Sequence, residues 1–365
     1  MAPQTELSSA VLPSAKPVYT IQPLEDPRWT ELAERHPSAS AFHTVAWLKA
    51  LAQTYGYQPI AYTTSPPGAA LENALAFCRI ASWITGSRLV SLPFSDHCAP
   101  LADNLADLDT LLSAAGQTLR HDKLRYLELR PLRPLAELPA AWRTSDAYVF
   151  HQLDLSPDLD RLFGNFHKSS TQRKIQRAER DGVVCQTGRS PALLDAFWKL
   201  LLITRRRHQV PPQPRQWFEN LISCFGHSLQ IRVAYHSARP IAAVLTLRHK
   251  DTLVYKYGCS DTDHNNLGGT QLLFWQAIQD AWHRRLKVFD LGRTDSNNAG
   301  LITFKDRWGA TRSALTYSRL TVTPPAATIE HHEPRTVGRI ARAVLPYVPD
   351  RLLALAGSLL YKHVG

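Results

Sequence analysis

The residues best suited to chemistry follow an apolar, strand-like run near position 290. Asp290 lies within that run, and the polar residues Arg293 and Asp295 come directly after it. Lys305 follows a short distance further on, between Phe304 and Trp308. Ligands of α/β folds bind beyond the carboxyl ends of strands. A carboxylate and an ammonium group in such a place could orient an amine and stabilise a developing anion.

A second candidate is the polar segment before an apolar helix expected over Gly268–Arg285. Glycines let the backbone approach a ligand closely, and a helix N-terminus offers free N–H groups to an anion. Ordinary turn chemistry before a helix is the alternative interpretation. The candidate phosphate- or cofactor-binding residues are Asn265, Gly268, Gly269 and Thr270.

Basic residues account for a formal net charge of +11. They gather in Arg161–Gly182, in Arg205–Arg207 and in the C-terminal tail. On a helix, Arg173 and Arg177 would share one face. Such clusters attract phosphates, nucleic acid or an anionic membrane surface. The alternative is a solvated basic face that only keeps the protein soluble.

The elements that must position these residues occur twice in the same order: antiparallel strands, a polar loop, a helix and a strand. This order predicts a duplicated α/β domain rather than one large sheet. In the first half we expect a helix at Ser40–Gly56, strands at Gln58–Thr63, Ala74–Ala81 and Arg88–Pro93, a helix at Leu105–His121 and a strand at Leu124–Leu129. In the second half we expect helices at Ala192–His208 and Arg215–Phe225, strands at Leu229–Tyr235, Ile241–Arg248 and Thr252–Gly258, the helix at Gly268–Arg285, and strands at Lys287–Leu291 and Ala314–Val322.

We divide the chain into a disordered leader (1–17), an N-terminal domain (18–150), a C-terminal domain (151–323) and a linker with an amphipathic helical tail (324–365). Pro346 and Pro349 would split the tail into short helices. The tail could lie on the inner membrane surface or dock on its own domain.

Composition is typical of a soluble protein, with 44% hydrophobic residues and a mean hydropathy of -0.24. The five cysteines show no C-x-x-C spacing, and the histidines show no metal-binding spacing, so we expect reduced thiols and no metal site. We find neither a secretory signal nor a long apolar stretch. The expectation is a cytoplasmic protein, with peripheral contact to the inner membrane as an open possibility.

Three segments resemble the FemAB-type superfamily of acyltransferases. In that superfamily a strand ending in Asp-hydrophobic-Gly precedes Phe-Lys-x-x-(Phe or Trp)-Gly, and here Asp290–Gly292 precedes Phe304–Gly309. The superfamily also carries a basic helix at the start of its second domain, to which Lys168–Val183 is similar. Ala99–Asp103 is similar to its Gly-Pro-x-x-Asp motif, with Ala99 in place of Gly.

The resemblance implies an α/β (α+β) fold of two tandem GNAT-like domains with mixed sheets. It implies an N-acyltransferase that passes an aminoacyl or acyl group to an amine of a cell-envelope precursor such as that of peptidoglycan. No bound cofactor is expected; the acyl donor would be aminoacyl-tRNA or acyl-CoA. The GNAT pyrophosphate motif, (Gln or Arg)-x-x-Gly-x-(Gly or Ala), is degenerate because Asn265 and Thr270 depart from it, which counts against acyl-CoA.

The resemblance also suggests roles for residues. Lys305 would stabilise acyl or phosphate charge, and Asp290 or Asp103 would orient or deprotonate the amine. Asp96 and His97, in the same loop as Asp103, are rivals for that role. The key arginine of the basic helix aligns on Gln172 or on a neighbour. The residues expected to bind an anionic, phosphate-bearing substrate are Arg173, Lys174, Arg177, Arg293, Asp295 and Trp308.

Two other functions stay open. One is an acyl-CoA-dependent N-acetyltransferase of polysaccharide or envelope biosynthesis. The other is a non-catalytic nucleic-acid-binding protein that uses the basic helix on phosphates. Aromatic residues are not interleaved with its charges, as they are in a base-stacking platform.

Overall fold

The computed structural model describes residues 16–135, 138–322 and 348–364. Most of the predicted leader (1–15) lies outside the described residues. So do most of the linker and the first part of the tail (323–347).

The first half begins at a short edge strand and ends in a long strand that enters the second half. Helix α2 shows how local sequence sets these bounds. The Thr44 hydroxyl accepts from the Trp47 N–H at its start, and Gly56, with φ of 71°, ends it in left-handed backbone. The elements are β1 (Tyr19–Ile21), α1 (Arg28–Arg35), η1 (Ala41–His43), α2 (Val45–Tyr55), β2 (Gln58–Thr63), β3 (Leu75–Ile80), β4 (Arg88–Val90), α3 (Leu105–His121), β5 (Leu127–Leu129) and β6 (Arg143–Asp154).

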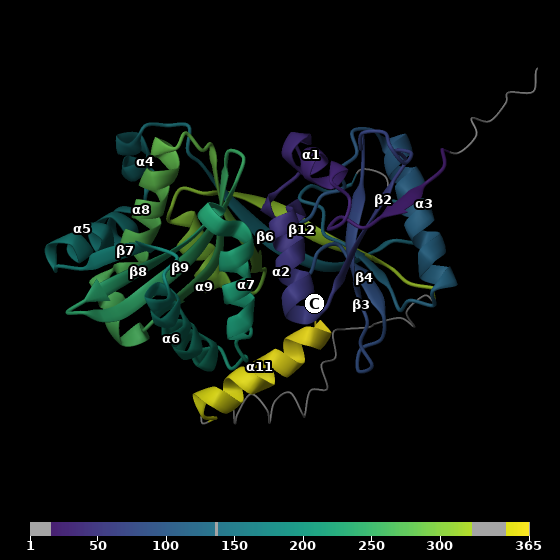
Figure 1. Cartoon of the computed structure of the whole chain (residues 1–365). Helices are drawn as coiled ribbons and strands as arrows, with labels where there is room; N and C mark the ends of the chain where they lie inside the picture. Colours follow the sequence, from purple (N-terminus) through teal and green to yellow (C-terminus); the bar gives the residue numbers. More distant parts are fainter. Residues whose placement is uncertain (1–15, 136–137, 323–347, 365) are drawn as a thin grey trace, which may run out of the picture.

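The second half lies beside the first (Figure 1). Its elements are α4 (Leu159–Asn165), η2 (Lys168–Gln172), α5 (Arg173–Arg180), β7 (Val184–Gly188), α6 (Pro191–Arg207), α7 (Arg215–Phe225), η3 (Gly226–Ser228), β8 (Leu229–His236), β9 (Arg239–His249), β10 (Thr252–Ser260), η4 (Thr262–Leu267), α8 (Gly269–His283), β11 (Val288–Asp295), α9 (Ala299–Asp306), β12 (Thr311–Leu320) and α11 (Asp350–Val364).

All named strands join one mixed sheet in the order β1-β2-β3-β4-β5-β12-β6-β11-β10-β9-β8-β7. Each half contributes one parallel pair, β4 with β5 and β10 with β11, among antiparallel neighbours. This repetition confirms the tandem arrangement. The expectation that the halves would not share one large sheet is wrong, because β12 pairs with both β5 and β6, and β6 pairs with β11. The expected domain boundary at 150/151 falls inside β6.

The two halves also share a hydrophobic core. Helix α2 of the first half packs against α7 of the second, with the Trp47 and Trp217 rings 5.2 Å apart and edge to face. Both side chains are fully buried. A sheet and a core that cross the junction fix its geometry, so side chains from both halves can form one site.

In the C-terminal tail, the structure agrees with the predicted helix start after Pro349. Helix α11 begins directly after Pro349, as the proline predicts, and the residues around Pro346 lie outside the described ranges. The helix docks on the body along the lower edge in Figure 1. Tyr57 donates to the Tyr361 carbonyl at 2.7 Å, and Tyr361 donates to the Pro211 carbonyl at 3.1 Å. Within the described part of the chain, we find no helix with both the length and the apolar character to cross a bilayer.

Candidate active site

Strand β11 bends where the predicted motif lies. Its pairing with β6 shifts register between Asp290 and Arg293, and Gly292 has φ of 71°. The Gly292 N–H donates to Asp290 Oδ1 at 2.7 Å. A side chain at Gly292 would be strained by this φ and would meet the Asp96 carboxylate at 3.2 Å. Glycine is therefore needed for β11 to pass this carboxylate.

Lys305 is held under this bend by helix α9. Its side chain is only 2% exposed, and Nζ donates to the carbonyls of Gly292 at 2.9 Å and Arg293 at 3.0 Å. Burial lowers the pKa of Lys305 to about 8, against the opposing effect of Asp96 and Asp290. An ammonium group has three N–H donors. With two of them used on β11, the third can serve another acceptor.

A loop of the first half supplies the facing carboxylate and imidazole. Its residues Leu92 and Phe94 have positive φ values of 54° and 59°, a conformation that costs free energy in non-glycine residues. The loop brings His97 Nε2 to 2.9 Å from Asp290 Oδ2, and both side chains are buried. It also brings Asp96 Oδ2 to 3.0 Å from Lys256 Nζ on β10.

Arg293 and two tyrosines close the same cluster. The Arg293 guanidinium lies 4.2 Å from the Tyr148 ring centroid and 5.1 Å from that of Tyr317. Arg293 Nε is 3.9 Å from Asp96 Oδ1, and the Tyr317 hydroxyl donates to the Asp96 carbonyl at 2.7 Å. Charged side chains from β10, β11, α9 and one loop, with two tyrosines from β6 and β12, therefore meet at the junction of the halves.

Burial and neighbouring charges shift the pKa values of Asp96 and Lys256 in this cluster. Burial alone would raise the pKa of Asp96, but Lys256 and Arg293 outweigh it and hold that pKa below its usual value. Burial lowers the pKa of Lys256, opposed by Asp96. We call Asp96, His97, Lys256, Asp290, Arg293 and Lys305 the junction cluster.

The basic helix is joined to the segment that carries Lys305. The Thr171 hydroxyl donates to the Arg307 carbonyl at 3.2 Å, and the Phe166 and Trp308 rings are 4.9 Å apart. On α5, Ile175 and Ala178 are buried as predicted, while Arg173 and Arg177 are exposed. Arg177 forms an ion pair with Asp181.

Gln172 has a structural task of its own. Its side-chain amide donates to the carbonyls of Phe163, Gly164 and Phe166 at the end of α4. This amide therefore satisfies carbonyls that the end of the helix leaves without a partner.

The glycines before α8 are needed for packing. At Gly268, which has φ of 75°, a Cβ would overlap the backbone carbonyl oxygen of Lys174. At Gly269 a Cβ would meet Ile241 at 2.9 Å. Asn265 lies in η4, where its carbonyl accepts from the Gly268 N–H, and Thr270 is in the first turn of α8. These four residues thus lie beside α5, and the carbonyl of Lys174 faces Gly268.

Three predicted residues lie apart from the junction cluster. Asp103 is 3.3 Å from His36 Nε2, in a surface hollow lined also by Asn73 and Asp107. Asp295 is exposed at the end of β11. Trp308 is 1% exposed and packs among aromatic rings, including Phe274 at 5.2 Å, so its side chain lies in the core rather than on an open surface.

Lys256, Tyr148 and Tyr317 are not among the residues that the sequence predicts for the site. A lysine between two tyrosines in an otherwise apolar strand was the available signal for Lys256. Asp96 and His97 were named only as rivals of Asp103, yet they are the loop residues that touch Asp290 and Lys256. Among the described residues, no group of three or more His, Cys, Asp or Glu side chains is placed to hold a metal ion.

Known proteins are similar to this chain in sequence and in fold. Residues 165–306, which contain α5, α8, β11 and Lys305, match the acetyltransferase (GNAT) domain family. A stretch of 144 residues is 27% identical to the UDP-N-acetylmuramoylpentapeptide-lysine N(6)-alanyltransferase of Weissella viridescens. That stretch covers 39% of this chain and 43% of the relative, less than half of its length.

Solved structures share the fold over most of the chain. The crystal structure of FemX aligns with a TM-score of 0.65 and 12% identity, covering 84% of this chain and 97% of FemX. A tandem GNAT protein from the clavulanic acid biosynthesis pathway aligns with a TM-score of 0.54 and 11% identity, covering 84% of this chain and 99% of that one. The fold is thus that of a tandem GNAT protein. Within that class, its fold is similar to that of FemX.

Proposed function

We propose that the chain transfers an aminoacyl group from an aminoacyl-tRNA to an amine of a phosphate-bearing cell-envelope precursor. The observation that carries this proposal is the placement of Lys305, buried at the junction and hydrogen-bonded to the bent end of β11. The name of the Weissella relative, which describes alanyl transfer to a lysine amine of a UDP-N-acetylmuramoylpentapeptide, supports the acceptor class.

The reaction needs a stabilised oxyanion. The amine nitrogen attacks the acyl carbonyl carbon, a C–N bond forms, and the carbonyl oxygen gains negative charge. The C–O bond to the tRNA ribose then breaks, and the proton lost by the amine ends on the departing hydroxyl. With a pKa of about 8, Lys305 is mostly charged at neutral pH. Its third N–H would donate to the oxyanion from a site of low dielectric, where such a bond is strong.

The two candidate carboxylates differ in availability. Both oxygens of Asp290 are engaged, one by the Gly292 N–H and the other by His97. The side chain of Asp103 is 76% exposed. We therefore assign Asp290 to holding β11 and His97 in place. Asp103 lies apart from the junction cluster, so we assign it to binding a part of the acceptor remote from the reacting amine.

The surroundings of α8 favour a tRNA donor over acyl-CoA. In GNAT enzymes that use CoA, the pyrophosphate occupies the helix N-terminus. Here the Lys174 carbonyl, a partial negative charge, lies against Gly268. The exposed Arg173 and Arg177 beside it would instead bind backbone phosphates.

A donor comparison tests the proposal. The purified full chain would be incubated with a peptidoglycan-precursor peptide and either aminoacyl-tRNA or acetyl-CoA, and mass spectrometry would detect the product. Aminoacylated product with the tRNA donor alone is expected. Acetylated product would favour the N-acetyltransferase instead. Binding of uncharged tRNA without product from either donor would favour the nucleic-acid-binding function.

We further propose that the tail places the enzyme on an anionic membrane surface. The outward face of α11 exposes Leu352, Leu355, Leu359 and Leu360 to between 47% and 64%. Trp83, 89% exposed, lies at one end of this face, with its ring 6.0 Å from that of His363. Lys362 is exposed beside it, and Asp350, the one carboxylate of α11, is paired with Arg206. Amphipathic helices with such faces bind at the bilayer interface.

Flotation with phosphatidylglycerol vesicles tests this contact. The wild type should float, and Trp83→Ser/Leu359→Ser should not. Val184→Ser, which changes a residue of similar exposure on β7, serves as the control. Equal flotation of wild type and the double variant would refute the contact.

A further inference from the structure

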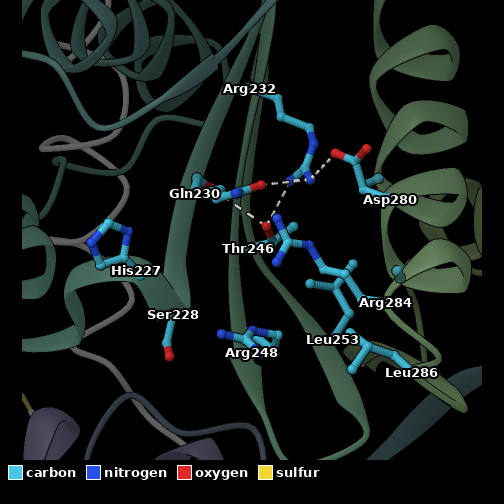
Figure 2. A pocket seen from close by; sticks show the side chains of 12 residues that line it. His227, Ser228, Gln230, Arg232, Thr246, Arg248, Leu253, Asp280, Arg284 and Leu286 are labelled. Atoms are coloured by element: carbon cyan, nitrogen blue, oxygen red, sulfur yellow. Dashed lines mark hydrogen bonds and ion pairs between the residues drawn. The ribbon is translucent and has the colours of Figure 1, made fainter.

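A basic crevice lies at the C-terminal end of α8, the end opposite Gly268 (Figure 2). It is enclosed by η3, β8, β9, the start of β10 and the last turn of α8. Three arginines line it, Arg232, Arg248 and Arg284, with Asp280 as the one carboxylate among the lining residues. No residue of the junction cluster takes part.

Arg232 has a donor without a partner. The residue is 2% exposed, and its guanidinium donates to Asp280 at 2.7 Å, Gln230 at 2.7 Å and Thr246 at 3.0 Å. Its Nε is buried and makes no hydrogen bond within the described chain. Buried guanidinium donors are normally all satisfied. The Nε–H of Arg232 is therefore left without an acceptor among the described residues.

The charges in the crevice do not balance. Arg248 is half-buried and Arg284 exposed, and neither forms an ion pair with any residue in the described ranges. Three guanidinium charges against one carboxylate leave two positive charges. Burial lowers the pKa of Arg232; Asp280 opposes that effect, and the nearby Arg284 adds to it. A bound dianion would relieve this repulsion.

The size of the crevice limits what can enter. The space that it offers to water-sized groups is about 20 Å³, enough for about one water molecule. One oxygen of a tetrahedral oxyanion fits there, while the remaining oxygens would lie at the mouth beside Arg248 and Arg284. Arginine forks match phosphate oxygens in geometry and charge.

We propose that the crevice of Arg232, Arg248 and Arg284 binds a phosphate group that carries two negative charges. A phosphomonoester or inorganic phosphate fits this description, since both are dianionic above their second pKa of about 6 to 7. A phosphodiester, with one charge, does not. The site is independent of the transfer reaction, so its failure would leave the proposed function untouched.

Calorimetric titration of the full chain at pH 8 and low ionic strength tests the site. Inorganic phosphate should bind, and dimethyl phosphate should bind at least about tenfold more weakly. Arg248→Gln/Arg284→Gln should weaken phosphate binding by at least about tenfold. Lys287→Gln, which removes an exposed lysine outside the crevice, should leave it within about twofold. Thermal unfolding of each variant checks that the fold is kept.

Titration with a second ligand distinguishes a phosphomonoester from free phosphate. Tighter binding of glycerol 3-phosphate than of phosphate identifies a phosphomonoester as the occupant, and the reverse identifies the free ion. The site is refuted if phosphate gives no binding, if dimethyl phosphate binds equally well, or if the double variant binds like the wild type.

Discussion

Replacing Asp96 by Asn should destabilise the junction of the two halves strongly. The carboxylate is 3.0 Å from Lys256 Nζ and 3.9 Å from Arg293 Nε. At an effective dielectric constant of about 20, these distances correspond to attractions of about 5.5 and about 4 kcal/mol. Desolvation offsets much of this, but Asp96→Asn leaves Lys256 charged, buried and unpaired. Breaking one side of such a pair costs about 3–5 kcal/mol.

The companion variant Lys256→Met separates this effect from simple loss of packing. Because Arg293 still faces Asp96 in that variant, it should lose only about 1–2 kcal/mol. The double variant Asp96→Asn/Lys256→Met has no unpaired lysine. It should be more stable than the sum of the single losses predicts, by about 2 kcal/mol.

Urea unfolding of the four proteins measures this coupling. The pH dependence gives a second readout. Since the pKa of Asp96 is held below 3.8, its contribution is present above pH 3.8 and is lost as pH falls through the lowered value. That loss should be missing in Asp96→Asn. Additivity of the single variants within about 0.5 kcal/mol would refute the reasoning.

Three further predictions concern single residues. Gly268→Ala should lower the free energy of unfolding by about 1–3 kcal/mol more than Gly56→Ala does, because both glycines have left-handed backbone but only Gly268 lies against Lys174. Chemical unfolding of the two variants measures the difference, and equal losses would be inconsistent with this close approach. Trp308→Phe should keep transfer activity, whereas Trp308→Ala should lower the free energy of unfolding by about 3–5 kcal/mol. If the Phe variant lost activity while its stability was unchanged, Trp308 would instead contact the substrate. The transfer rate should fall as pH rises through about 8, because Lys305 loses its charge there; a pH–rate profile without that descending limb would contradict a charged Lys305.

Local patterns predicted many elements closely. The helices Leu105–His121 and Arg215–Phe225 and the strand Gln58–Thr63 have the predicted bounds. Periodic burial and local caps determine such elements, and both can be read from neighbouring residues. Helix α9 was not predicted, because it is short and contains Gly300.

The continuity of the sheet could not be predicted in this way. The insertion of β12 between β5 and β6 pairs residues that are far apart in the sequence. Strand propensity does not say which partner a strand selects.

The sequence predicts the part of the candidate site that lies within one contiguous motif. Asp290 and Lys305 lie together because β11 and α9 are close in sequence and the bend at Gly292 joins them. Lys256 was missed because a lysine in a strand normally faces solvent. Only the loop of Asp96, contributed by the other half, makes its burial possible.

Single-turnover transfer by Lys305→Ala tests the central claim most directly. With preformed aminoacyl-tRNA and acceptor in excess, the rate of the variant should fall by about 10²–10³, the usual effect of losing one oxyanion donor. Lys287→Ala, which removes an exposed lysine, should retain the wild-type rate, and circular dichroism should show the fold kept in both. A Lys305→Ala rate within about threefold of wild type would contradict the role of the junction cluster in transfer.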